Sequence, residues 1–191
     1  MTRMITLYHA PRSRSSRFVW LLEELETPHE LVHVTIRRRD GSGGPDSRNP
    51  HPDKKVPALV HDGELVTESA AIVLYLTDLF PAKRLAPQPG ERMRGAYLTW
   101  LAYYAGVMEP AIQLRAASQP SPELEGMDQR IVRALEAGPH LLGERFSGAD
   151  VLVASVAQWS RAVLPKTGAV DEYLARVTSR TAFKRALARD G

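Results

Sequence analysis

Hydroxyl and guanidinium side chains crowd one short segment near the start of the chain, Tyr-His-Ala-Pro-Arg-Ser-Arg-Ser-Ser-Arg over residues 8–17. The segment follows a short apolar run and precedes a helical pattern, which predicts the turn into a helix. A helix N-terminus offers free N–H groups and a partial positive charge. Such a turn would stabilise an anion, including a thiolate. Ordinary helix capping by serine explains the same residues, and for this segment alone it is the simpler interpretation.

A second segment with chemical potential is Lys54-Lys55-Val56-Pro57. Pro57 stands where a strand is expected to start, which suits a residue without an N–H group. A cis bond at Pro57 would expose the backbone N–H and C=O of Val56, so that a peptide-like ligand could pair with them. A plain turn is the alternative.

The third segment is Thr67-Glu68-Ser69 at the start of another helical pattern. Glu68 could bind an ammonium group, and the N–H and hydroxyl of Ser69 could bind a carboxylate. Helix capping is again the alternative. Taken together, the three segments describe a ligand with an amino-acid end, a peptide middle and an anionic sulfur, with two lysines placed for a second carboxylate. Glutathione fits that description.

The elements that would position these segments alternate between strand and helix in the first half of the chain. Asp62-Gly63 stands between two short apolar runs and indicates a hairpin. A long polar loop precedes it, of a kind that is usually functional or mobile. The expected elements are a strand over 4–8, a helix from Ser13 that Pro28 closes, a strand over 31–36, the loop over 37–55, hairpin strands over 57–60 and 64–67, and a helix over 70–80. This β-α-β-β-β-α order predicts an α/β thioredoxin-like N-terminal domain over residues 1–81.

A proline-rich linker over residues 82–90 separates this domain from a second half in which every pattern is helical. We expect an all-α C-terminal domain over 91–191. Its predicted helices cover 91–117 with a kink at Pro110, 127–142, a buried helix capped by Ser147 and Asp150, and one or two helices over 171–188.

Composition excludes several classes of protein. The 191 residues include 43% hydrophobic residues, a globular value, and 25 Lys plus Arg against 22 Asp plus Glu. A net charge of +3 without a basic stripe argues against a nucleic-acid partner. The absence of cysteine removes disulfides, thiolate metal sites and cysteine nucleophiles. With no secretory signal and no apolar run of ~18 residues, we expect a soluble, cytoplasmic protein that binds neither membrane nor metal.

The three segments, in their order, resemble those of cytosolic glutathione transferases, and bacterial members in particular. The resemblance is carried by VPALVHDGELVTESAAIVLYLTDLFP, by YHAPRSRSSRFVWLLEEL and by LLGERFSGADVLVASVAQW, and it spans nearly the whole chain. It implies a homodimeric detoxification enzyme with glutathione as co-substrate. Such an enzyme stabilises the glutathione thiolate and conjugates it to a small hydrophobic electrophile.

The resemblance also implies roles for individual residues. Val56, before Pro57, matches the residue whose backbone pairs with the cysteinyl part of glutathione, and Glu68 with Ser69 matches the γ-glutamyl clamp. Lys54, Lys55 and Arg14 are the other candidate glutathione-binding residues. Ser13 occupies the hydroxyl position of serine-type members and Tyr8 that of tyrosine-type members. Ser15 is a third candidate for the catalytic hydroxyl, because a helix start is uncertain by a residue or two.

The helical domain would contribute the electrophile pocket in such an enzyme. Tyr103, Tyr104, Met108 and Trp159 are the candidate wall residues, and simple core packing is the alternative for each. The absence of cysteine excludes the cysteine-type members of the family. Another glutathione-dependent enzyme (an isomerase, dehalogenase or peroxidase) and a non-catalytic binding module with the same fold remain as alternative functions.

Overall fold

The structure is a computed structural model that describes residues 4–191. Contacts divide this part of the chain into two compact units, one made of the described residues up to Ile72 together with Thr181–Gly191, the other of Val73–Arg180. The first unit therefore combines two segments that lie far apart in the sequence. The boundary that the sequence placed at residue 81, with a linker over 82–90, stays a prediction.

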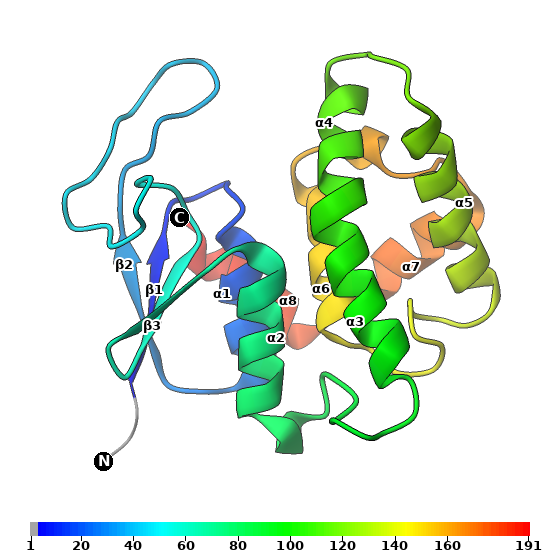
Figure 1. The fold of residues 1–191 in the computed structure, drawn as a ribbon, viewed down its shortest axis with the longest axis horizontal. Coiled ribbons are helices and arrows are strands. Elements are labelled where there is room, and N and C mark those ends of the chain that lie inside the picture. The colour runs from blue at the N-terminus through cyan, green and yellow to red at the C-terminus, as the bar shows by residue number, and fades with distance from the viewer. Residues whose placement is uncertain (1–3) are drawn as a thin grey trace. The chain divides into compact units, whose positions relative to one another are not determined.

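A mixed four-stranded sheet forms the centre of the first unit (Figure 1). Its strands are β1 (Ile5–His9), β2 (His29–His33), β3 (Ala58–His61) and β4 (Glu64–Thr67), in the spatial order β2-β1-β3-β4. β1 runs parallel to β2 and antiparallel to β3, and β3 runs antiparallel to β4. The thioredoxin-like α/β class expected from the sequence is confirmed, and Asp62-Gly63 forms the predicted hairpin turn.

Two helices from opposite ends of the sequence pack against each other on one side of this sheet, α1 (Ser16–Leu25) and α8 (Thr181–Arg189) (Figure 1). The ring of Phe183 in α8 meets that of Trp20 in α1 edge to face, with centroids 4.9 Å apart. Arg185 and Arg189 of α8 both bind the carboxylate of Glu23. Burial alone would raise the pKa of Glu23, but the two guanidinium groups outweigh burial and lower it.

The second unit is helical. Beyond α2 (Ser69–Leu79), which crosses from the first unit into the second, it contains the 3-10 turns η1 (Pro81–Lys83), η3 (Val156–Gln158) and η4 (Arg161–Val163), the π-helical turn η2 (Tyr104–Met108), and the helices α3 (Arg94–Tyr103), α4 (Glu109–Ala116), α5 (Pro122–Glu136), α6 (Gly148–Ser155) and α7 (Gly168–Thr178). α6 is buried along its whole length and begins with the predicted capping box of Ser147 and Asp150. A Cβ atom on Gly148 would collide with side chains of α2 and α3, so only glycine fits where these helices meet.

Several predicted boundaries were wrong, for identifiable reasons. The first helix begins at Ser16 rather than Ser13, because residues 13–16 form a separate turn closed by a 3.1 Å bond from Ser16 N to Ser13 O. β2 begins and ends earlier than predicted, at His29 and His33. α5 begins five residues before the predicted start, since Ser121 accepts a bond from Glu123 N and Pro122 supplies the first helical position.

The helix predicted over 91–117 begins at Arg94 and changes its geometry before Pro110 rather than at it. The backbone stays helical from α3 through the π-helical turn Tyr104–Met108 into α4. This turn lies directly before Pro110, which lacks the N–H that would bond to the preceding turn. The expected pair of terminal helices is present as α7 and α8, with the first starting at a Thr167 cap.

Candidate functional site

The three segments singled out in the sequence converge at one edge of the sheet. Tyr8 lies opposite Ala58 in the register of β1 and β3, and Ala58 lies opposite Thr67 in that of β3 and β4. β1 and β4 therefore end at the edge where β3 begins. The turn after β1, the Val56-Pro57 pair before β3 and the Glu68-Ser69 pair after β4 all meet there.

The chain beyond β2 also reaches this edge. Val34 N donates a 2.9 Å bond to the carbonyl oxygen of His9, although Val34 lies outside β2 itself. Val34, Val56 and Ala10 then form a small buried cluster. The Val56–Pro57 peptide bond is cis, as the sequence analysis envisaged. All four strands thus contribute their ends to the site.

Serine hydroxyls form a connected chain inside the turn between β1 and α1. Ser13 Oγ lies 2.8 Å from Ser15 Oγ, and Ser15 Oγ lies 2.8 Å from Nδ1 of His9. Ser15 Oγ also accepts a 3.1 Å bond from Ala10 N. Ser15 is completely buried, whereas Ser13 is partly exposed, so of these two serines Ser13 is the one whose side chain reaches the surface.

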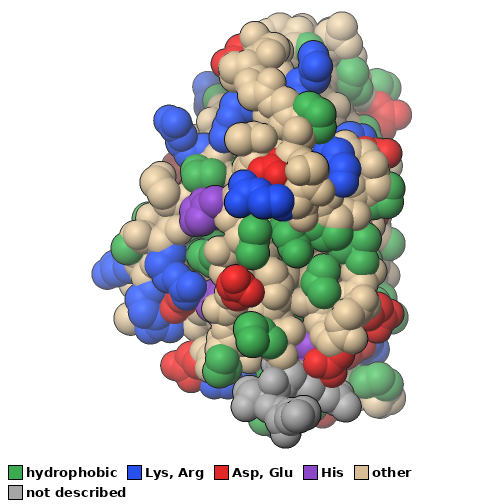
Figure 2. All heavy atoms as spheres, turned by 90° about the vertical axis from the view of Figure 1, so that its left-hand side faces the viewer, with side chains coloured by type: hydrophobic (Ala, Val, Ile, Leu, Met, Phe, Trp, Pro, Cys, Tyr) green, Lys and Arg blue, Asp and Glu red, His purple; other side chains and the backbone are tan. Residues whose placement is uncertain are grey.

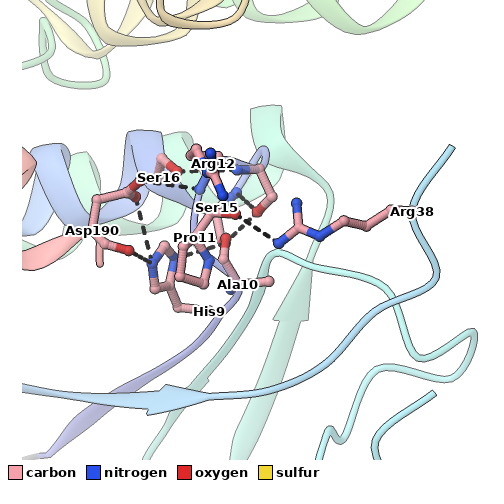
Figure 3. Close-up of polar contacts among 9 residues, drawn as sticks. His9, Ala10, Pro11, Arg12, Ser15, Ser16, Arg38 and Asp190 are labelled. Atoms are coloured by element: carbon pink, nitrogen blue, oxygen red, sulfur yellow. Dashed lines mark hydrogen bonds and ion pairs between the residues drawn. The ribbon is translucent and has the colours of Figure 1, made fainter. Parts of the chain in front are cut away.

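His9 lies between this chain of hydroxyls and Asp190, beyond the end of α8 (Figure 3). Its Nε2 lies 3.1 Å from the carbonyl oxygen of Asp190 and 3.5 Å from the carboxylate Oδ1. Asp190 Oδ2 accepts a 3.0 Å bond from the backbone N–H of Arg12. Burial lowers the pKa of His9, although Asp190 opposes this effect, so the imidazole is neutral at neutral pH.

Tyr8 is placed differently from the serines. Side chains alternate along a strand, so Tyr8 points away from the face to which Leu7 and His9 are directed. Its half-buried side chain packs against the cluster of Ala10, Val34 and Val56. Tyr8 and Ser13 therefore lie on different sides of the turn, and within residues 4–191 no hydrogen bond joins Tyr8 to the chain of hydroxyls.

A positively charged groove of about 620 Å³ adjoins the turn. It is lined by Arg14, Ile36, Arg37, Arg38, Arg39, Pro45, Asp53, Lys54, Lys55 and Val56. Six of these residues are cationic and one is acidic, so the groove favours an anionic ligand. Lys and Arg side chains recur over the face that carries β2 and the loop after it (Figure 2). Arg38 ties the loop to the turn by donating a 3.0 Å bond to the carbonyl oxygen of Pro11 (Figure 3).

A compact turn over residues 49–55 positions the lysines and Val56. Asn49 is buried at its centre, where its side chain donates a 2.9 Å bond to Lys55 O and accepts a 3.0 Å bond from His51 N. The ammonium of Lys54 donates a 2.6 Å bond to Asn49 O. Lys54 therefore holds this turn together, while Lys55 is exposed and lies 3.3 Å from Asp53, a weak surface pair.

Glu68 and Ser69 stand where β4 turns into α2. Glu68 is exposed and adopts a φ of 66°, in the left-handed region that is uncommon for residues other than glycine. Backbone strain of this kind often lies at ligand sites. Ser69 is buried and is the first residue of α2, so its N–H has no acceptor within the helix. An exposed carboxylate can bind the ammonium of an amino-acid head group, and the adjacent helix N-terminus can bind its carboxylate.

The four candidate pocket residues of the helical unit are not equivalent. Tyr104 and Met108 are buried at the two ends of the π-helical turn. The guanidinium of Arg130 lies 4.1 Å from the ring centroid of Tyr103, and Trp159 is 39% exposed. Burial favours the packing interpretation for Tyr104 and Met108 and leaves Tyr103 and Trp159 accessible.

Three residues that hold the site together carry no distinctive signal in the sequence. His9 is part of the first segment, but its partner Asp190 lies 181 residues further along, and no local pattern links the two. Asn49 lies in a polar loop, where an asparagine carries no special signal. Arg38 belongs to a run of three arginines that is equally typical of a solvated surface.

Comparison with known proteins relates the chain to one family. The sequence profile described as "Glutathione S-transferase, N-terminal domain" matches residues 7–84, which include the turn, the cis proline and Glu68-Ser69. These residues form a glutathione S-transferase N-terminal domain. Glutathione S-transferase GstA of Escherichia coli O157:H7 is 27% identical over 197 residues, covering 97% of this chain and 98% of that protein. Glutathione S-transferase 3 of Schizosaccharomyces pombe is 44% identical over 73 residues, which are 38% of this chain and 29% of that protein.

Solved structures extend the likeness to both halves of the chain. A ternary complex of BphK, a bacterial glutathione S-transferase, is 28% identical with a TM-score of 0.80, covering 97% of this chain and 99% of its own. A sphingomonad glutathione S-transferase complexed with glutathione is 28% identical with a TM-score of 0.78, covering 97% of this chain and 98% of its own. The fold of the family therefore extends over nearly the whole chain.

Two further properties of the described residues bear on function. No helix within residues 4–191 is both long and apolar enough to cross a membrane. In the same part of the chain, no group of three His, Asp or Glu side chains is placed to hold a metal ion.

Proposed function

We propose that this protein binds glutathione at the edge of its sheet and transfers the glutathione thiolate to a small hydrophobic electrophile. The observation that carries the proposal is the convergence of three ligand-binding segments beside a cationic groove. The glutathione S-transferase N-terminal domain over residues 7–84 supports it, as does the likeness to a sphingomonad glutathione S-transferase complexed with glutathione.

Each part of the tripeptide has a candidate partner in this arrangement. Glu68 and Ser69 bind the γ-glutamyl head group, and the backbone of Val56 pairs with the cysteinyl residue. The glycyl carboxylate lies in the groove, toward Arg14 and Lys55, with Lys54 holding the wall of the groove through Asn49.

Ser13 is the proposed activator of the thiol. A free thiol has a pKa near ~8.5, so only a few per cent is ionised at neutral pH. Lowering that pKa by about two units requires roughly 2.7 kcal/mol of preferential stabilisation of the thiolate. One hydrogen bond from a hydroxyl to a charged group contributes about 1.5–3 kcal/mol, so a single serine suffices. The partial exposure of Ser13 and the complete burial of Ser15 favour Ser13.

A Glu68→Ala variant tests the binding site. The variant loses a charge-assisted contact to the ligand ammonium, so we expect glutathione affinity to fall by at least about tenfold. Isothermal calorimetry measures this change, and Glu64→Ala, at the exposed start of β4, is the matched control. Equal affinities of wild type and Glu68→Ala would show that the head group binds elsewhere.

The reaction itself requires a turnover screen with glutathione against aryl halides, epoxides, hydroperoxides and isothiocyanates. Conjugation of the first two classes without peroxide reduction supports a conjugating transferase. Activity on hydroperoxides, or release of halide without a glutathione adduct in the final product, would instead support another glutathione-dependent enzyme. Glutathione binding without any turnover would support a binding module. We further propose that the protein is a cytoplasmic homodimer. Light scattering at micromolar concentration would check the dimeric mass.

A further inference from the structure

The hydrogen-bonding roles around His9 follow from its partners. Its Nε2 faces the carbonyl oxygen and the carboxylate of Asp190, which can only accept, so Nε2 carries the proton. Nδ1 is then a bare acceptor. The hydroxyl of Ser15 lies 2.8 Å from Nδ1 and 3.3 Å from a competing acceptor, the carbonyl oxygen of Ala10. Nδ1 is the nearer acceptor, and it has no proton with which to make this contact, so Ser15 donates its single proton to His9.

Counting donor protons and acceptor lone pairs also fixes the direction of the hydrogen bond between Ser13 and Ser15. Because the Ser15 proton points at His9, the 2.8 Å contact between the two serines requires Ser13 to donate to Ser15. Ser15 Oγ also accepts from Ala10 N, while Ser13 Oγ accepts a 3.2 Å bond from Ser15 N. Ser13 Oγ therefore keeps one lone pair that no group of residues 4–191 engages. That lone pair belongs to the exposed end of the chain of hydroxyls.

We infer that His9 accepts the thiol proton of bound glutathione through Ser13 and Ser15, with Asp190 stabilising the imidazolium that results. The inference rests on the proposed function. The S–H bond breaks and its proton passes to Ser13 Oγ, Ser13 passes its own proton to Ser15 Oγ, and Ser15 passes its proton to Nδ1. The products are a thiolate and an imidazolium, and no proton leaves the protein.

The proton transfer ends with a hydrogen bond that stabilises the thiolate. After the shift, the Ser13 hydroxyl donates to the sulfur instead of to Ser15, so one set of groups first removes the proton and then stabilises the anion. His9 does not touch the ligand and acts through the serines as a positioning residue. Burial keeps it neutral in the free protein, which is the state that can accept a proton.

The charged and titratable groups around His9 support the assignment. Asp190 faces Nε2 beyond the end of α8 and favours the imidazolium. The ring of His33 in β2 lies 5.3 Å from that of His9, centroid to centroid, and its protonation would oppose a charge on His9. The bond from Arg12 N to Asp190 holds the carboxylate beside the turn (Figure 3).

Nitrogen-15 NMR of the histidine rings tests the inference at neutral pH. We expect His9 to be neutral in the free protein, to acquire a proton on both ring nitrogens with saturating glutathione, and to stay neutral with S-methylglutathione, which has no thiol proton. The His9→Asn variant assigns the signals. The Ser15→Ala variant should bind glutathione while His9 stays neutral, and Asp190→Asn should reduce the protonated fraction.

A second readout uses the thiolate absorbance of bound glutathione. His9→Asn keeps an acceptor near Ser15 that cannot hold the proton, so we expect about tenfold less thiolate at neutral pH, restored about one unit higher. A neutral His9 in the saturated wild-type complex, with thiolate present, would overturn the inference and leave the proposed function intact. The absence of saturable glutathione binding would overturn both.

Discussion

The hydroxyl of Ser13 belongs to the chain of hydroxyls, whereas the side chain of Tyr8 packs against Ala10, Val34 and Val56, so their roles are separable by mutation. Ser13→Ala removes the exposed hydroxyl, so the pH at which bound glutathione ionises should rise by about one to two units, given about 1.5–3 kcal/mol for a charged hydrogen bond. Tyr8→Phe should leave that pH unchanged. Titration of the thiolate absorbance measures both variants. An upward shift confined to Tyr8→Phe would transfer the role to the tyrosine.

His9 also makes folding stability depend on pH. Burial lowers its pKa below the ordinary value of 6.5, so below that pH the unfolded chain binds a proton that the folded protein does not. Stability should therefore fall as the pH drops from about 7.5 to about 5.5. Urea unfolding at the two pH values should show a smaller loss for His9→Asn than for wild type. Equal losses would mean that other groups, such as His29, account for the whole effect.

At the scale of elements, the loop after β2 is shaped by a glycine. Gly43 has a φ of 70°, and a Cβ atom there would collide with the backbone of Ile36. Gly43→Ala should therefore displace the arginines of the groove and weaken glutathione binding several-fold. Neighbouring Gly44 has open space around its Cβ position, so Gly44→Ala is the matched control. Calorimetry would detect the difference, and similar affinities for the two variants would exclude the loop from binding.

Local signals in the sequence predicted most of the elements and part of the site. Asp62-Gly63 and the Ser147–Asp150 box specify a turn and a helix start by themselves, and the structure contains both. The start of α5 was missed because its first turn is polar, so hydrophobic periodicity begins only at Met127. The pairing of His9 with Asp190 depends on tertiary packing of α8 and leaves no local trace.

The π-helical turn Tyr104–Met108 shows a further limit of prediction from sequence. Pro110 predicted a kink in the long helix, and the structure has a π-helical turn directly before it, because a proline disturbs hydrogen bonding to the preceding turn. Candidate residues on such a turn cannot be placed on a helix face from spacing alone. Tyr103, the last residue of α3, is partly exposed, whereas Tyr104, the first residue of the π-helical turn, is buried.

At the scale of the whole molecule, the first unit depends on α8. Phe183 is buried against Trp20, so Phe183→Ala should destabilise this unit by about 3–5 kcal/mol. Leu187 lies on the same helix but is 53% exposed, and Leu187→Ala should have an effect of less than about 0.5 kcal/mol. Urea unfolding compares the two, and hydrogen exchange should locate the loss in α1 and β1. A uniform loss across the helical unit would contradict this assignment.

The position of α8 has a consequence for biosynthesis. Domains usually fold in the order in which the ribosome produces them. Here the strands and α1 emerge first, but the helix that covers Trp20 and brings Asp190 to His9 is translated only after the entire helical unit. An apolar surface of the nascent sheet and α1 therefore stays exposed until α8 has been made. His9, the proposed proton acceptor, gains its partner Asp190 last. A ribosome stalled before Thr181 would therefore present a folded helical unit attached to an unfinished ligand-binding unit.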